Sequence, residues 1–158
     1  MEIELDGFLA DSVANVQGKL YALGAGWNRI AVALFPGRHD RVGIGLLFRV
    51  RAGAERKPRR FELRLLGPED EELVLGSGQE GPINRIGGEF TAGADDEQVV
   101  PIALNLNGLT LPRPGTYRVV VSIDGTDLKT LPFRVEALAA ARARQPASQP
   151  STGTAGYL

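Results

Sequence analysis

The sequence predicts an all-β fold, an antiparallel β-sandwich of about eight or nine strands. Three observations lead to this expectation. Glycine and proline are frequent, with 20 and 10 residues in a chain of 158, and both punctuate short strands and turns. Several stretches alternate strictly between apolar and polar residues, which is the period of a strand with one buried face. A single stretch, Glu136 to Arg144, favours a helix through its alanines.

The N-terminal part predicts strands separated by glycine and proline signals. An Asp6-Gly7 turn signal lies near the start, and strands are expected over residues 19–24 and 27–35. A glycine-rich bend over residues 24–26 separates these two strands, and Pro36-Gly37 ends the second. His39, the only histidine, is therefore expected in a surface turn.

The middle of the chain shows the clearest alternation. In residues 42–52 one face carries only apolar side chains, those of Ile44, Leu46, Phe48 and Val50. Phe61, Leu63 and Leu65 form the inner face of the next strand, and Arg60, Glu62 and Arg64 form its outer face. Residues 76–88 are rich in glycine and are expected to form a long loop.

The last hairpin is the most sharply defined unit. A tight turn is expected at Asn107-Gly108 before it and another at Asp124-Gly125 within it. The residues predicted to face the core are Tyr117, Val119, Val121, Ile123, Leu131, Phe133 and Val135. Pro132 lacks a ladder donor, so it is expected on an edge strand or where no ladder bond is needed.

The domain organisation follows from these elements. We expect a β-sandwich domain over residues 1–136, a short helix over 137–144 and a disordered tail over 145–158. The tail ends in Tyr157 and Leu158, a short C-terminal motif of the kind that a partner can capture, although a frayed end is the simpler interpretation.

Composition limits the cellular location and the kinds of site that the chain can contain. The chain has no cysteine, and hence neither a disulfide framework nor a thiolate site. Its net charge of −1 argues against bulk attraction to nucleic acid or to an anionic membrane. The first residues lack the basic and apolar regions of a secretory signal, and no apolar run approaches the roughly 18 residues that span a bilayer. A cytoplasmic location is therefore expected.

A resemblance supports the fold expectation. Residues 111–119, in which Pro114-Gly115 precedes Tyr117, resemble the approach to a late strand of immunoglobulin-like sandwiches, where a tyrosine anchors a corner. Together with residues 103–109, 131–135 and 19–27, they also resemble a family of small actinobacterial proteins of unknown function. The resemblance implies a β-sandwich and a bacterial cytoplasmic setting, but no activity or site.

No catalytic, cofactor or metal site is predicted. His39 has no nucleophile motif near it, and the glycine-rich segments lack the lysine and helix of a phosphate-binding loop. Acidic loops at residues 69–72 and 95–97, and the pair Asp124 and Asp127, contain oxygen ligands of the kind that calcium prefers. Solvated turns are the simpler interpretation of these loops. The chain is therefore not expected to be an enzyme.

Basic clustering is the most specific surface feature. Residues 49–64 contain seven basic and two acidic residues. Alternation places Arg49, Arg51, Arg60 and Arg64 on the outer face of one predicted hairpin, as a patch for an acidic partner. A charged strand edge that prevents aggregation is the alternative, and nucleic acid is disfavoured because no aromatic side chain lies on that face.

The sequence thus favours a non-catalytic protein-interaction or scaffold domain. The alternative is a small-molecule or divalent-ion binding module that uses the acidic loops. The expected partner is a protein and not a membrane, and self-association stays open.

Overall fold

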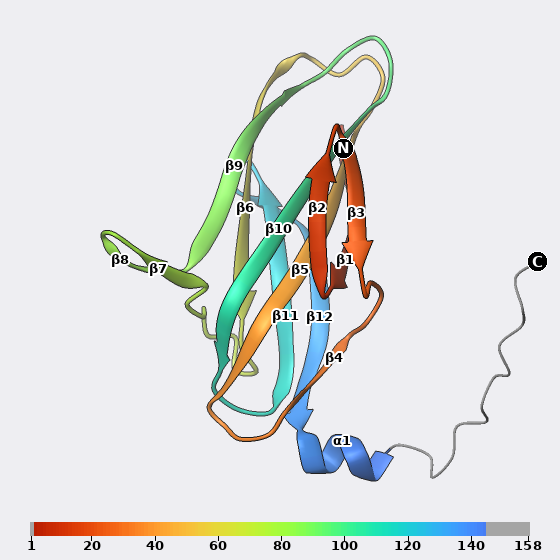
Figure 1. Cartoon of the computed structure of the whole chain (residues 1–158). Coiled ribbons are helices and arrows are strands. Elements are labelled where there is room, and N and C mark those ends of the chain that lie inside the picture. Colours follow the sequence, from red (N-terminus) through yellow and green to blue (C-terminus); the bar gives the residue numbers. More distant parts are fainter. Residues whose placement is uncertain (1, 145–158) are drawn as a thin grey trace, which may run out of the picture.

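The computed structural model describes residues 2–144, which form twelve strands and one short helix (Figure 1). The all-β prediction and the short C-terminal helix are confirmed. In chain order the elements are β1 (Ile3–Ala10), β2 (Ser12–Val16), β3 (Lys19–Leu23), β4 (Arg29–Val32), β5 (Gly37–Val50), β6 (Lys57–Leu66), β7 (Gly76–Gly78), β8 (Gly81–Ile83), β9 (Arg85–Ala92), β10 (Gln98–Leu111), β11 (Gly115–Ile123), β12 (Thr126–Ala137) and α1 (Leu138–Arg144).

Eight of these strands form two sheets that enclose the core (Figure 1). The smaller sheet has the order β1-β5-β10, and the larger sheet has the order β4-β12-β11-β6-β9. Neighbouring strands pair antiparallel, except that β4 runs parallel to the end of β12. The prediction of a purely antiparallel arrangement is therefore wrong at this edge. The direction of β4 is fixed by its short continuation into β5 of the other sheet.

The core lies between the inner faces of the two sheets, and the alternation predicted it correctly. The four apolar residues on the inner face of β5 have no exposed surface, and Leu63 and Leu65 of β6 are equally buried. Phe48 packs against Phe90, with ring centroids 5.1 Å apart. Burial of each such side chain contributes about 1.5–3 kcal/mol before the entropy of ordering is counted.

The predicted hairpin between β11 and β12 is confirmed. Asp124 and Gly125 have φ angles of 48° and 83°, the left-handed pair that a two-residue type I′ turn requires. Tyr117 stacks on Phe133 at 5.6 Å, and its hydroxyl donates a hydrogen bond of 2.6 Å to the carbonyl oxygen of Arg113. Pro132 lies just before the four residues of β12 that pair with β4, so its missing N–H leaves that ladder intact.

A hairpin formed by β2 and β3 lies over the outer face of the smaller sheet (Figure 1). The side-chain amide of Asn105 holds it, accepting a hydrogen bond from the N–H of Val13 at 3.0 Å and donating one to its carbonyl at 2.8 Å. Gly43 allows this close approach, because a Cβ at that position would lie 3.0–3.1 Å from the backbone of Ser12. The hairpin is thus a third layer outside the core.

Several predicted turns are wrong for a common reason. Asp6-Gly7 lies within β1, His39 lies within β5 opposite Leu109, and Asn107-Gly108 lies within β10. Strand β5 pairs along most of its length with both neighbours, and this long-range pairing overrides the local turn signals. Gly108 absorbs the local irregularity with a φ angle of 66°.

Other boundaries also differ from the predictions. The expected loop over residues 76–88 contains the β7–β8 hairpin and the first part of β9, which raises the strand count above the predicted number. The helix begins at Leu138, because Glu136 and Ala137 still pair with β4 as the end of β12. The predicted tail over residues 145–158, with Tyr157 and Leu158, lies outside the described residues. Within residues 2–144, no helix is long and apolar enough to cross a membrane.

Candidate protein-binding surface

The four arginines of the predicted basic patch do not share one hairpin. Arg49 lies on the outer face of β5 in the smaller sheet, and Arg51 comes directly after that strand. Arg60 and Arg64 lie on β6, which belongs to the larger sheet. The predicted hairpin geometry is therefore wrong, because the chain crosses from one sheet to the other between residues 51 and 57. Partner binding by any of these arginines stays a prediction.

The two arginines of the smaller sheet are paired with acidic neighbours. Arg49 donates to Asp6 at 2.9 Å and Arg51 donates to Glu4 at 2.7 Å, both across the β1–β5 pair. The hydrogen bond that Arg49 donates to Asp6 is the main cause that raises the pKa of Arg49. Basic clustering in the sequence thus overstates the positive charge of the surface, since the compensating acids come from distant segments.

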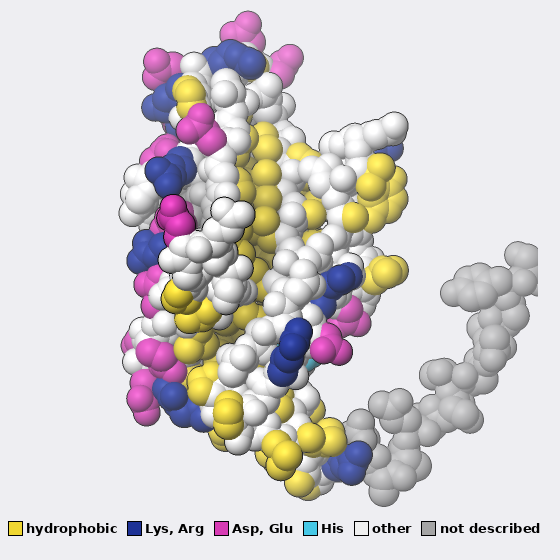
Figure 2. Space-filling view, turned by 60° about the vertical axis from the view of Figure 1, so that its left-hand side comes forward, with side chains coloured by type: hydrophobic (Ala, Val, Ile, Leu, Met, Phe, Trp, Pro, Cys, Tyr) yellow, Lys and Arg dark blue, Asp and Glu magenta, His cyan; other side chains and the backbone are white. Residues whose placement is uncertain are grey.

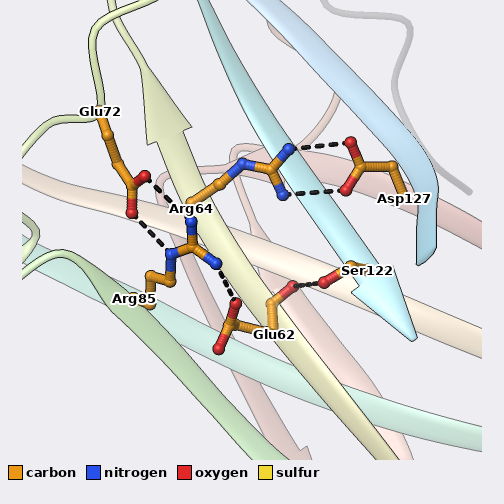
Figure 3. A network of polar contacts seen from close by, with 6 residues as sticks. All are labelled: Glu62, Arg64, Glu72, Arg85, Ser122 and Asp127. Carbon is orange, nitrogen blue, oxygen red and sulfur yellow. Dashed lines mark hydrogen bonds and ion pairs between the residues drawn. The ribbon is translucent and has the colours of Figure 1, made fainter. Parts of the chain in front are cut away.

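The outer face of the larger sheet carries a network of ion pairs (Figure 3). Arg64 binds Asp127 through two hydrogen bonds of 2.9 and 2.8 Å. Arg85 of β9 donates to Glu72 at 2.7 and 3.1 Å and to Glu62 at 2.7 Å. The hydrogen bonds from the arginines hold the pKa of Glu72 and that of Asp127 below their ordinary values.

This network covers residues that alternation alone would leave exposed. Val120 and Ser122 point outward on β11, yet both are buried. They lie opposite Arg64 and Glu62 of β6, whose side chains take part in the network. The larger sheet therefore presents this network of paired charges to solvent, together with the exposed side chains of Arg60 and Arg134.

The acidic loops do not converge into a metal site. Within residues 2–144, no three His, Cys, Asp or Glu side chains come together in a way that could hold a metal ion. Asp127 instead forms an ion pair with Arg64, and Asp124 accepts a hydrogen bond of 3.0 Å from the backbone N–H of Arg60.

The β2–β3 hairpin presents large apolar side chains to solvent. Val16, Tyr21 and Leu23 are 51%, 56% and 74% exposed. The strand register places them on one side of the hairpin, because Ala14 lies opposite Tyr21 and Ser12 opposite Leu23. Val13, on the other side, is buried against the smaller sheet. We call Val16, Tyr21 and Leu23 the hairpin face.

Figure 2 shows apolar side chains gathered on the projecting hairpin at the right of the view. The face carries one charged residue, Lys19, opposite Val16. Sequence reasoning missed this surface because residues 20–23 are apolar in both phases of the alternation, so no side could be assigned to the core. The signal available was Gly18 between the two strands and Gly24 after the second, which indicate the turn and the end of a hairpin.

A second apolar feature is the furrow between β9 and β10. Each of these strands is hydrogen-bonded on one side only among the described residues, and the furrow lies between these edges (Figure 2). Its half-buried apolar side chains pack against the core from both strands. They are Ile86, Phe90, Val100, Ile102 and Leu104.

A third feature is an arginine buried at the end of the two sheets. Arg59 is only 5% exposed, although it lies in the basic cluster that the sequence placed at the surface. It has the same phase on β6 as Phe61 and Leu63, and so points between the sheets. The sequence contained this signal, an arginine in the apolar phase of an alternating strand.

A protein-family model matches most of the chain. The model of a family of unknown function, DUF6941, matches residues 6–136. The chain belongs to this family. The matched range runs from β1 to the end of β12 and includes the hairpin face and Arg59. The predicted membership of a family of unknown function is thus confirmed. No curated protein matches the chain.

Solved structures give distant likenesses. An alkylpurine DNA glycosylase, AlkC, from Pseudomonas fluorescens is similar with a TM-score of 0.46 and 14% identity. A β-glucosidase from Listeria innocua is similar with a TM-score of 0.44 and 12% identity. These matches cover 86% and 85% of this chain, but the chain spans only 31% of the glycosylase and 16% of the glucosidase.

Proposed function

We propose that this DUF6941 domain is a non-catalytic protein-interaction module and that the hairpin face binds the partner. The observation that carries the proposal is the exposure of Val16, Tyr21 and Leu23 on a hairpin that lies outside the core. Clustered exposed apolar side chains cost free energy in water and mark interaction sites in stable proteins. Tyrosine is also enriched at protein interfaces, because its ring is apolar and its hydroxyl can stay hydrated.

The chemistry of the face defines the partner. Its centre is apolar, and its charged residue is Lys19 beside the turn. A protein surface with an apolar centre and an acidic residue at its rim would complement it. The hairpin is held by side-chain hydrogen bonds from Asn105 and Asn15, so the face is ordered before the partner arrives.

We also infer that the fold is immunoglobulin-like. The hydrogen bond from Tyr117 back to the carbonyl of Arg113 supports this, since a tyrosine corner at the start of a late strand is a hallmark of such sandwiches. An actinobacterial source and a cytoplasmic location stay predictions that rest on the resemblance and on the sequence.

The test compares capture from cells by variants of the two apolar surfaces. Tyr21→Ser and Leu23→Ser remove apolar area from the hairpin face, and both sites are exposed, so stability should change little. Val74→Ser is the matched control, because Val74 is 47% exposed and precedes the β7–β8 hairpin. The proposal predicts that proteins captured by the wild type are lost with both hairpin variants and retained with the control.

Sedimentation of the purified variants identifies the occupant. If the partner is a second copy, the wild type sediments as a dimer and the hairpin variants as monomers.

Loss of capture with Ile86→Ser in the furrow, but not with either hairpin variant, would move the binding surface to the β9–β10 furrow and overturn the proposal.

A further inference from the structure

Arg59 is a charged side chain in a place where the fold expects an apolar one. It continues the inner face of β6 beyond Phe61, Leu63 and Leu65, and lies opposite Phe90 of β9. Removing a guanidinium from water is strongly unfavourable unless its donors are satisfied. The guanidinium of Arg59, buried at the end of the sheets, therefore needs hydrogen-bond partners from the protein or from a ligand.

The partners of Arg59 satisfy only part of the guanidinium. Nη2 donates to a carboxylate oxygen of Glu2 at 3.0 Å and to the carbonyl oxygen of Glu55 at 3.3 Å. Nε is buried and has no hydrogen-bond partner among the described residues. Glu2 is itself 52% exposed at its side chain. A carboxylate that engaged both Nε and Nη2 would satisfy the guanidinium better than Glu2 does.

A cavity of about 320 Å³ lies beside this guanidinium, at the end of the molecule where the chain begins. Arg59 and Glu2 form its polar part, together with Asp124 and Thr126 near the β11–β12 turn. Ile3, Ile123 and Leu128 form apolar walls, and the first two are buried. The cavity thus combines a buried cation with aliphatic walls, and its volume suits a small ligand.

We propose that this cavity is a binding site for a small organic carboxylate with a short aliphatic chain. The carboxylate would pair with Arg59 through Nε and Nη2, and the chain would pack against Ile3, Ile123 and Leu128. In the ligand-free protein, Glu2 holds the guanidinium as an internal counter-ion. The ligand displaces Glu2, whose carboxylate is already half exposed and returns to water at little cost.

The competition with Glu2 explains why the aliphatic chain matters. Glu2 belongs to the same chain, so its effective concentration at Arg59 is high and a bare carboxylate such as acetate competes poorly. Burial of several CH₂ groups adds favourable transfer free energy for each group and shifts the competition toward the ligand. Asp124 is exposed to solvent at the turn, where water and salt screen its charge.

The test is a titration of the full chain with three probes, followed by the backbone amide resonances in NMR spectra. Hexanoate has the proposed chemistry, hexanol lacks the carboxylate, and acetate lacks the chain. We expect saturable shifts at Ile3, Thr126 and Leu128 with hexanoate, and at least tenfold weaker binding of the other two probes.

Two variants assign the effect to the proposed groups. Glu2→Gln removes the competing charge and should strengthen hexanoate binding about tenfold. Arg59→Met fills the same space without charge, a replacement that buried ion pairs commonly tolerate, and should abolish saturable binding. Glu4→Gln and Arg51→Met are the matched controls, because Glu4 and Arg51 form an ion pair on the outer face of the smaller sheet, away from the residues that line the cavity. Neither control should change the affinity.

Three results would overturn the proposal. Hexanol that binds as tightly as hexanoate would show an apolar cavity with no anion site. Weaker binding in Glu2→Gln would show that Glu2 recognises the ligand and does not compete with it. Absence of saturable shifts in both the wild type and Glu2→Gln would leave Arg59 with a purely structural role.

Discussion

At the scale of single residues, Val121 shows how alternation and sheet position act together. It faces the core from the middle of the larger sheet, between Leu63 of β6 and Lys129 of β12, and has no exposed surface. Its outward neighbours Val120 and Ser122 are buried as well, under the ion-pair network. The predicted inward face of β11 is confirmed, and its outward face is buried by side chains of the neighbouring strand.

Val121→Ala should therefore destabilise the domain by about 1–3 kcal/mol, because it removes buried methyl groups and leaves a cavity. Val99→Ala is the matched control, since Val99 is 46% exposed on β10 and should change stability by less than about 0.5 kcal/mol. Urea unfolding of the three proteins measures the difference. Equal stability of the two variants would contradict the assigned packing of β11.

Tyr117 links the hairpin to the pH dependence of stability. Burial raises the pKa of its phenol above the ordinary value of 10.0. A group whose folded pKa is raised contributes stability that is fully present below its unfolded pKa and is lost as the pH rises through the folded pKa. The wild type should therefore lose stability above about pH 10, in addition to any loss from other groups.

Tyr117→Phe tests this contribution. At pH 8 the variant should be less stable by about 1 kcal/mol, because the carbonyl of Arg113 loses its donor. Above pH 10 it should lose less stability than the wild type, since phenylalanine does not ionise. Urea unfolding between pH 8 and 11 measures both effects, with Tyr21→Phe as the exposed control. Parallel pH profiles for the wild type and Tyr117→Phe would show that the phenol is not desolvated.

At the scale of elements, the β2–β3 hairpin depends on a glycine in another strand. Gly43 has an ordinary backbone conformation, and its missing side chain lets the backbone of Ser12 approach. A side chain there would meet backbone, which cannot move aside as a flexible side chain can. Asn105 then fixes the hairpin at that distance.

Gly43→Val should lift the hairpin off the smaller sheet and leave the two-sheet core assembled. Hydrogen exchange should speed up in β2 and β3, while the inner residues of β5 and β11 stay protected. Gly76→Val is the control, because a Cβ at Gly76 would meet no atom within 4 Å. Unchanged exchange in the hairpin of Gly43→Val would contradict the proposed close packing.

The elements also show what the sequence could predict. The β11–β12 hairpin was predictable, because alternation, a type I′ turn and pairing of consecutive strands all act locally. Asn107-Gly108 misled for the opposite reason, since its strand pairs with β5 far away in the sequence. The same limit applies to the basic cluster, because Asp6 and Asp127, which neutralise Arg49 and Arg64, come from distant strands.

At the scale of the whole molecule, the two outer faces have different chemistry. The larger sheet carries the ion-pair network, and a hairpin with an apolar face lies over the β5–β10 part of the smaller sheet (Figures 2 and 3). The ion-pair network neutralises the charges of Arg64 and Arg85 on one face, whereas the hairpin face leaves apolar area that a partner would bury. This asymmetry favours a single preferred docking side.

Photo-crosslinking in the native cell tests most directly whether the hairpin face binds the partner. A benzophenone amino acid is placed at position 21 or 23 on that face. Positions 74 and 130, on the β7–β8 side and on the outer face of β12, serve as controls. The proposal predicts that positions 21 and 23 crosslink to the same protein and that neither control does. Crosslinks to one protein from position 130, with none from position 21 or 23, would contradict it.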